Sequence, residues 1–128
     1  DFQQLKIIQT LSQQLKLNNV IHPCPSVCLQ NGMSLSSRFD NFSEKDRNVF
    51  DKCANQIRLL ITKLKNDINK VNLVDFKSIL QQQGVKKIEY LEIRNEENLS
   101  FSKTCNKSRL FIAMYVGNVR VIDNFILY

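Results

Sequence analysis

The sequence predicts an α+β chain: a helix and a strand of the kind that end a doubly wound α/β domain, then two helices and a three-stranded, mainly antiparallel sheet. Apolar residues recur at helical spacing through the first half, and strand-like runs fill the last third. The Gly-Asn pair at 117–118 separates the last two runs, which indicates a hairpin. We expect two domains, residues 1–38 and residues 39–128.

The opening segment is predicted to be an amphipathic helix over residues 2–17. Its apolar positions follow helical spacing and are Leu5, Ile8, Leu11 and Leu15. Asp1 is suited to cap this helix, because the helix dipole favours a negative charge there. Since a natural domain seldom starts on the cap of its first helix, we expect further polypeptide before Asp1. Residues 20–22 are predicted to form a short strand.

A polar loop is expected at residues 24–37, because Pro23 and Pro25 block regular structure and Gly32 permits a tight turn. In doubly wound domains ligands bind outside the carboxyl ends of the strands, where this loop would lie. The loop leads into two hydroxyls and a guanidinium at residues 36–38, groups that fit phosphate oxygens. Taken alone, these residues also fit a solvated loop with a surface arginine.

Two helices are predicted after this loop. Ser43 is a good N-cap for the first, and Asp46 stands where a capping box needs it. The apolar residues of that helix follow a 3.6-residue period and are Val49, Phe50, Cys53, Ile57, Leu60, Ile61, Leu64 and Ile68. Asn72 opens the second helix, and Gly84 is predicted to end it in the left-handed conformation.

Strands are predicted at residues 86–93, 109–116 and 119–124, with a polar connection between the first two. The first of them has four candidate buried residues, Ile88, Tyr90, Leu91 and Ile93. The pattern therefore indicates a sheet that packs against the two preceding helices.

The chain is basic, with 18 Lys and Arg against 12 Asp and Glu and a net charge of +6. This suits anionic ligands in general. The basic residues are scattered among acids without interleaved aromatics, so we interpret them mainly as a solvated surface. The alternative is a non-catalytic basic module that binds nucleic acid or protein. No apolar run is long enough to span a membrane and no signal peptide is visible, so we expect a cytoplasmic location.

The cysteines allow two interpretations. Cys24 and Cys28 are four residues apart and follow His22, so the three could belong to a zinc site. We favour the other interpretation, in which all four, including Cys53 and Cys105, are small apolar residues in a reducing cytoplasm. His22 lies in an apolar run, and we expect a packed or hydrogen-bonded imidazole rather than a catalytic one.

Three separated motifs carry a family resemblance: DFQQL at residues 1–5, NGMSLSSR at residues 31–38 and VRVIDN at residues 119–124, the last preceded by IEYLEIR at residues 88–94. In order and spacing they resemble the pantothenate synthetase, or pantoate–β-alanine ligase, family. The resemblance extends over essentially all 128 residues.

The resemblance implies a fold and a reaction. The family belongs to nucleotidyltransferases related to class I aminoacyl-tRNA synthetases, so residues 1–38 would end a Rossmann domain and residues 39–128 would form a C-terminal lid. ATP, accompanied by Mg²⁺, would adenylate pantoate and release pyrophosphate. The amine of β-alanine would then attack the pantoyl adenylate to give pantothenate and AMP, a step toward coenzyme A. The resemblance also implies that the full-length protein forms a homodimer.

The resemblance also implies roles for seven residues. Asp1 matches an ATP contact, Gln4 matches a pantoate contact one helical turn on, and Val27 matches a residue that meets adenine through its backbone. The loop that corresponds to the KMSKS loop of the synthetases contains four further ATP-binding positions, Leu35, Ser36, Ser37 and Arg38. Arg38 and the two hydroxyls would stabilise the phosphates during adenylyl transfer. No metal ligand is implied.

The chain departs from the family pattern in three respects. The HIGH-like motif with the catalytic histidine lies far upstream in the family, and His22 is not its equivalent, so we expect no catalytic residue here and no activity from this chain alone. Phe39 replaces the usual Asn, and Ser34 the usual Ala or Pro. We also expect four apolar residues to lack the packing partners that the upstream half supplies: Leu5, Ile8, Val20 and Ile21.

Overall fold

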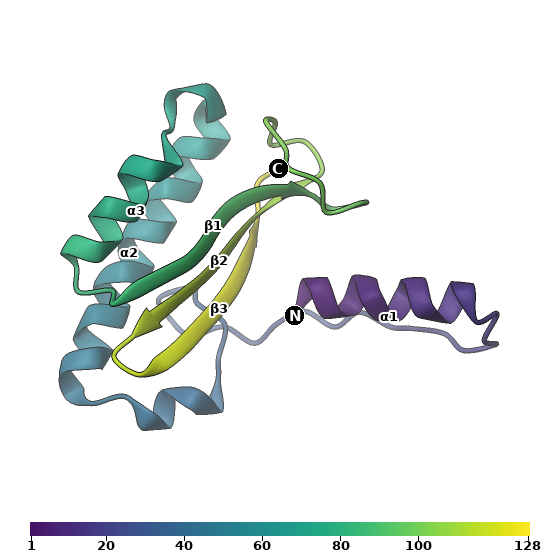
Figure 1. Cartoon of the computed structure of the whole chain (residues 1–128), viewed down its shortest axis with the longest axis horizontal. Helices are drawn as coiled ribbons and strands as arrows, with labels where there is room; N and C mark the ends of the chain where they lie inside the picture. The colour runs from purple at the N-terminus through teal and green to yellow at the C-terminus, as the bar shows by residue number, and fades with distance from the viewer.

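The computed structural model describes residues 1–128, with three α-helices and a three-stranded antiparallel sheet in the order β1-β2-β3 (Figure 1). Its elements are α1 (Phe2–Gln14), η1 (Ser37–Asn41), α2 (Glu44–Asn66), η2 (Ile68–Lys70), α3 (Leu73–Gln82), β1 (Lys87–Asn95), β2 (Ser108–Val116) and β3 (Val119–Ile126). Helices α2 and α3 cover one side of the sheet, and α1 extends away on the other side (Figure 1). No helix combines the length and the apolar character that crossing a bilayer requires.

The long helix α2 begins with the predicted capping box. The hydroxyl of Ser43 accepts a hydrogen bond from the Asp46 N–H at 3.2 Å, and the Asp46 carboxylate accepts one from the Ser43 N–H at 3.2 Å. The buried face of the helix recurs every three to four residues, at Phe50, Cys53, Ala54, Ile57, Leu60 and Leu64. This face supplies the largest helical share of the core.

Helix α3 also begins and ends as predicted. The Asn72 side chain accepts a hydrogen bond from the Val74 N–H at 2.9 Å, and Gly84 adopts a φ of +110° just after the helix. A side-chain carbon at residue 84 would lie 3.0 Å from Val49 of α2. Glycine thus permits both the left-handed turn and the close approach of the two helices.

The sheet has one apolar face, toward α2 and α3. In β2 this face consists of Leu110, Ile112, Met114 and Val116, all fully buried. The pairing of β1 with β2 shifts between Ile88 and Tyr90, so Glu89 is an extra residue in a β-bulge. The bulge explains why the apolar residues of β1 do not alternate strictly along the sequence.

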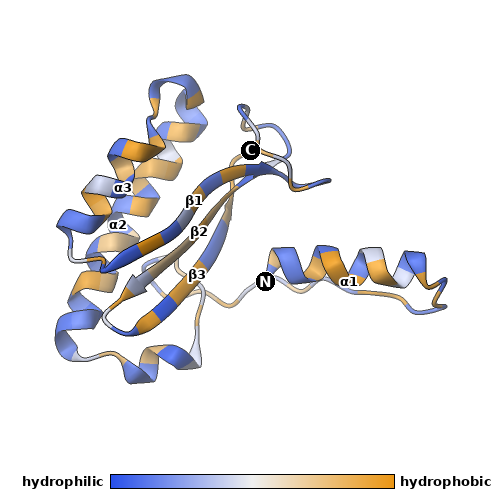
Figure 2. Cartoon of the chain, in the orientation of Figure 1, coloured by the Kyte–Doolittle hydropathy of each residue, from blue (hydrophilic) through white to orange (hydrophobic).

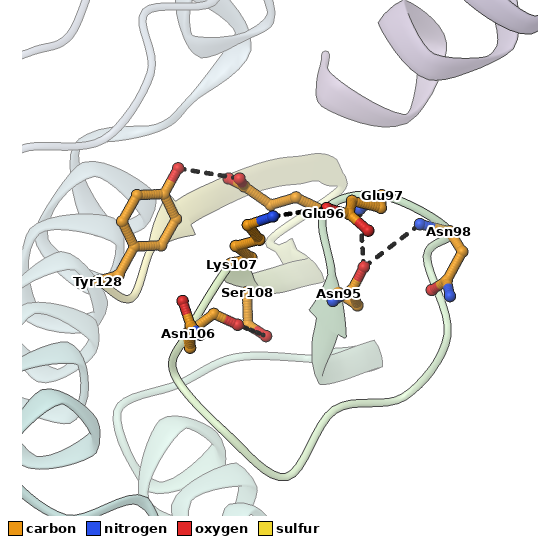
Figure 3. A network of polar contacts seen from close by, with 8 residues as sticks. All are labelled: Asn95, Glu96, Glu97, Asn98, Asn106, Lys107, Ser108 and Tyr128. Carbon is orange, nitrogen blue, oxygen red and sulfur yellow. Dashed lines mark hydrogen bonds and ion pairs between the residues drawn. The ribbon is translucent and has the colours of Figure 1, made fainter.

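Polar contacts hold the connection between β1 and β2 (Figure 3). Asn95 accepts a hydrogen bond from the Glu97 N–H at 2.8 Å, and Lys107 contacts Glu97 at 2.9 Å. The hydroxyl of Tyr128 donates to Glu96 at 2.9 Å and so ties the C-terminal residue to this connection. The polar segment predicted here is therefore ordered by its own side chains.

Helix α1 is capped by Asp1, as predicted: its carboxylate accepts hydrogen bonds from the N–H groups of Gln3 and Gln4 at 3.0 and 3.3 Å. The helix ends at Gln14, three residues earlier than expected. The predicted strand at residues 20–22 is wrong, because this segment pairs with no other strand and a strand needs a ladder partner.

Helix α1 stands away from the sheet and has apolar residues along its length (Figure 2), and most of its large apolar side chains are exposed. Ile8 is 45% exposed and Leu11 48%, and Val20 in the following segment is 78% exposed. The first turn packs on the sheet, where the rings of Phe2 and Phe111 lie 6.0 Å apart. Farther along α1 only Ser12 is buried, and its hydroxyl donates a hydrogen bond to the Asn19 side chain at 2.6 Å. The expectation of missing packing partners is confirmed for Ile8 and Val20, whereas Leu5 and Ile21 are half-buried within this chain.

Candidate functional site

A cavity of about 540 Å³ lies between the first turn of α1, the loop before α2 and the sheet. All six residues predicted to bind ATP line it: Asp1, Val27, Leu35, Ser36, Ser37 and Arg38. They come from segments separated by up to 37 residues, so their convergence is a property of the fold and not of a single loop. The cavity is the largest concentration of predicted site residues in the chain.

The seventh predicted site residue lies outside this cavity. Gln4 is exposed on α1, whereas its neighbour Gln3 contributes to the lining. Gln4 follows Asp1 by three residues, but its backbone rather than its side chain contacts the Asp1 carboxylate. Its contact with pantoate stays a prediction.

The sheet supplies a second group of lining residues that the sequence motifs did not single out as site residues. They include Tyr90, Phe111, Arg120, Asp123 and Asn124. Most of these positions alternate with core positions along β2 and β3, and therefore face away from α2 and α3. Arg120, Asp123 and Asn124 lie in the motif at residues 119–124 and Tyr90 in the motif at residues 88–94, so the motifs marked these positions without giving them a role.

The loop that enters the cavity is built on a tight turn. Gly32 has a φ of +87°, and the Leu29 N–H donates to the Met33 carbonyl at 2.8 Å. The Leu35 N–H then donates to the Val27 carbonyl at 2.8 Å. These bonds bring the Val27 and Leu35 backbones side by side at the edge of the cavity.

The next segment, η1, is fixed by its ends. The Ser36 hydroxyl caps it by accepting a hydrogen bond from the Arg38 N–H at 3.3 Å. Phe39 is buried, with its ring centroid 5.1 Å from that of Phe42 and 4.7 Å from that of Phe50. Phe39, which departs from the family pattern, thus anchors this segment in the core.

Ser34, the other departure, joins the loop to β3. Its N–H donates to one carboxylate oxygen of Asp123 and its hydroxyl to the other, each at 2.7 Å. These two bonds link residues that are 89 positions apart in the sequence. Hydrogen bonds to a carboxylate are shorter and stronger than those between neutral groups.

Two guanidinium groups line the cavity, and their surroundings differ. Arg120 contacts Glu89 at 2.7 Å, and its hydrogen bond lowers the pKa of that carboxyl group. The side chain of Arg38 is exposed and makes neither a hydrogen bond nor an ion pair. With the hydroxyls of Ser36 and Ser37 beside it, Arg38 offers unneutralised donors to an anion.

The histidine and two of the cysteines lie elsewhere than expected. His22, Cys24 and Cys28 are all exposed, and the imidazole makes no polar contact. The prediction of a packed or hydrogen-bonded His22 is therefore wrong, because the strand that would have enclosed it does not form. All four cysteines are free thiols, and no group of three or more His, Cys, Asp or Glu is placed to hold a metal ion.

Comparison with known proteins relates the chain to one family. A family model described as "Pantoate-beta-alanine ligase" matches residues 1–126. The pantothenate synthetase of Flavobacterium psychrophilum is 33% identical over 99% of the chain, and that of Caldicellulosiruptor bescii is 32% identical over 99%. In both cases the match spans 46% of the relative, so the chain covers about half the length of these proteins.

Solved structures agree with the sequence comparisons. A pantoate-β-alanine ligase from Francisella tularensis, described as complexed with β,γ ATP and β-alanine, superimposes with a TM-score of 0.75 at 28% identity. The match covers 99% of this chain and 41% of that one. A pantothenate synthetase from Thermus thermophilus shares the fold with a TM-score of 0.78 at 20% identity, covering 100% of this chain and 47% of that one. Since the family model extends over nearly the whole sequence, the chain belongs to the pantoate–β-alanine ligase family.

Proposed function

We propose that this chain is the ATP-binding part of a pantoate–β-alanine ligase. The complete enzyme would transfer AMP from ATP to the carboxylate of pantoate, with release of pyrophosphate. The β-alanine amine would then displace AMP to give pantothenate. The observation that carries this proposal is the convergence of Asp1, Val27 and residues 35–38 on one cavity beside an unpaired guanidinium.

The side chains suit the parts of ATP in different ways. Arg38 and the hydroxyls of Ser36 and Ser37 would bind phosphate oxygens and stabilise the negative charge that shifts during adenylyl transfer. Asp1 would accept hydrogen bonds from the ribose, and the Val27 backbone would meet adenine. Gln4 would contact pantoate, because an amide can serve a hydroxyl and a carboxylate at once.

Mg²⁺ would accompany ATP chiefly as a phosphate-bound ion, since it keeps several waters and needs few protein ligands. The carboxylates that line the cavity are those of Asp1 and Asp123. Both oxygens of Asp123 already accept hydrogen bonds from Ser34. Asp1 uses one oxygen to cap α1 and has the other oxygen available.

We further propose that residues 39–128 act as a lid over the nucleotide and that the reacting groups lie on polypeptide outside these 128 residues. The exposed apolar face of α1, which the complete enzyme would cover, supports the placement of further polypeptide beside these 128 residues. The chain alone would then bind ATP weakly and form no pantothenate. Homodimerisation is proposed for the complete enzyme only.

A chimera tests this function. This chain replaces the matching half of the Flavobacterium psychrophilum relative, and pantothenate formation from ATP, pantoate and β-alanine is measured for the chimera and for the chain alone. We expect turnover from the chimera and none from the chain. A chimera that melts cooperatively but forms no pantothenate would contradict the assignment, and turnover by the chain alone would contradict its proposed inactivity.

A further inference from the structure

We infer that Asp123 is a positioning residue for ATP: by accepting both donors of Ser34, its carboxylate holds residues 36–38 over the cavity. The inference rests on the proposed function, because it concerns the same nucleotide loop. Neither the family resemblance nor the sequence motifs assign a role to Asp123. The geometry of the two hydrogen bonds that Asp123 accepts from Ser34 points to this role.

The contact is suited to fix the loop in two directions at once. The N–H and hydroxyl of Ser34 reach separate oxygens of Asp123, each at 2.7 Å. Asp123 is itself oriented by the Asn124 N–H, which donates to it at 2.8 Å. Since Asp123 belongs to β3, the loop is fastened directly to the sheet.

Only Leu35 separates Ser34 from the hydroxyl of Ser36, so a displacement of Ser34 would move the phosphate-binding groups with it. Within η1, Phe39 is buried in the core and cannot follow such a movement. The residues between Ser34 and Phe39 are therefore held at both ends, by Asp123 at one end and by the core at the other. A serine supplies the side-chain donor that the alanine or proline usual in the family lacks.

Charge and position predict opposite effects for the variant Asp123→Asn. The carboxylate lines the cavity and would repel phosphate, so removing its charge should strengthen ATP binding if charge were its only contribution. The amide of Asp123→Asn has one acceptor oxygen, so it can accept only one of the two hydrogen bonds from Ser34. Its NH₂ group would face the other donor of Ser34. If Asp123 positions the loop, ATP binding weakens instead.

The experiment uses the ¹⁵N-labelled chain and two measurements. Amide hydrogen exchange at residues 34–38 is recorded without nucleotide, and ATP with Mg²⁺ is then titrated to millimolar concentration while the amide shifts are followed. The variants are Asp123→Asn and Ser34→Ala, with Ser34→Thr as the conservative replacement. Asp40→Asn is the matched control, because Asp40 lies on η1 but is exposed and makes no side-chain bond.

We expect Asp123→Asn and Ser34→Ala to raise exchange at residues 34–38 and to weaken ATP binding about three- to tenfold, the effect of losing a hydrogen bond. Ser34→Thr should restore both, and Asp40→Asn should not weaken binding. Unchanged exchange, or ATP binding by Asp123→Asn as tight as wild type, would overturn the inference while the proposed function stands. If the wild-type cavity shows no shifts with ATP, the proposed function fails and the inference fails with it.

Discussion

The two arginines beside the cavity show how identical side chains acquire different roles. Arg120 lies within hydrogen-bonding distance of Glu89, so the carboxylate neutralises its charge and occupies two of its donors. Arg38 has no such partner, and the cap and buried ring on either side of it fix its backbone. A ligand can therefore use the Arg38 guanidinium without first breaking an ion pair.

The four thiols provide a prediction at the same scale. Burial raises the pKa of the Cys53 thiol from 9.0 to about 11, and burial also raises that of Cys105, whereas Cys24 and Cys28 are exposed. Because the thiolate is the reactive form, an aromatic disulfide reagent at pH 8 should label Cys24 and Cys28 rapidly. Labelling is counted by absorbance and located by mass spectrometry.

Cys53 should react only after urea unfolds the chain, and the half-buried Cys105 should react more slowly than Cys24 and Cys28. A Cys24→Ser, Cys28→Ser double variant should lose the fast phase. Rapid labelling of Cys53 in the native chain would contradict its burial.

The raised pKa of Cys53 also has a consequence for stability. The folded state favours the neutral Cys53 thiol. The contribution of Cys53 to the free energy of unfolding is therefore complete below pH 9.0 and is lost as the pH rises toward 11.

At the scale of the element, the start of α2 is set by a local bond pattern. The Ser43 hydroxyl satisfies the Asp46 N–H, one of the donors that a helix leaves unpaired at its first turn. Replacing Ser43 by alanine should lower the free energy of unfolding by about 1 kcal/mol. Urea denaturation measures the change. Ser78→Ala, on the exposed face of α3, is the control and should be close to neutral; an equal loss in both variants would contradict the role of the cap.

The elements that could be predicted from the sequence carry their own signals. The capping box of α2, the left-handed Gly84 after α3 and the turn at Gly117 each depend on a few neighbouring residues. A strand at residues 20–22 does not depend on neighbouring residues alone, because its backbone needs another strand to pair with. An apolar run does not by itself reveal whether a partner strand lies beside it.

At the scale of the whole molecule, the cavity joins residues that are far apart in the sequence: 1, 3, 26–27, 34–39, 90, 111 and 120–124. Its loop half could be predicted, because residues 35–38 form a continuous motif. Its sheet half, such as Tyr90 and Phe111, could not, because those residues are marked only by which face of a strand they occupy. The bulge at Glu89 changes which residues of β1 face the core, so the alternation of buried and exposed residues cannot be followed along this strand.

The central claim is that Arg38 binds the phosphates of ATP, and the most direct test is the ATP affinity of Arg38→Ala. The control is Arg58→Ala, which removes a positive charge from α2 at a residue that does not line this cavity. Loss of a charged hydrogen bond costs about 1.5–3 kcal/mol, so ATP titration followed by amide shifts should show binding weakened about tenfold or more. The control should bind as the wild type does. Equal ATP affinity for Arg38→Ala and the wild type would contradict the account.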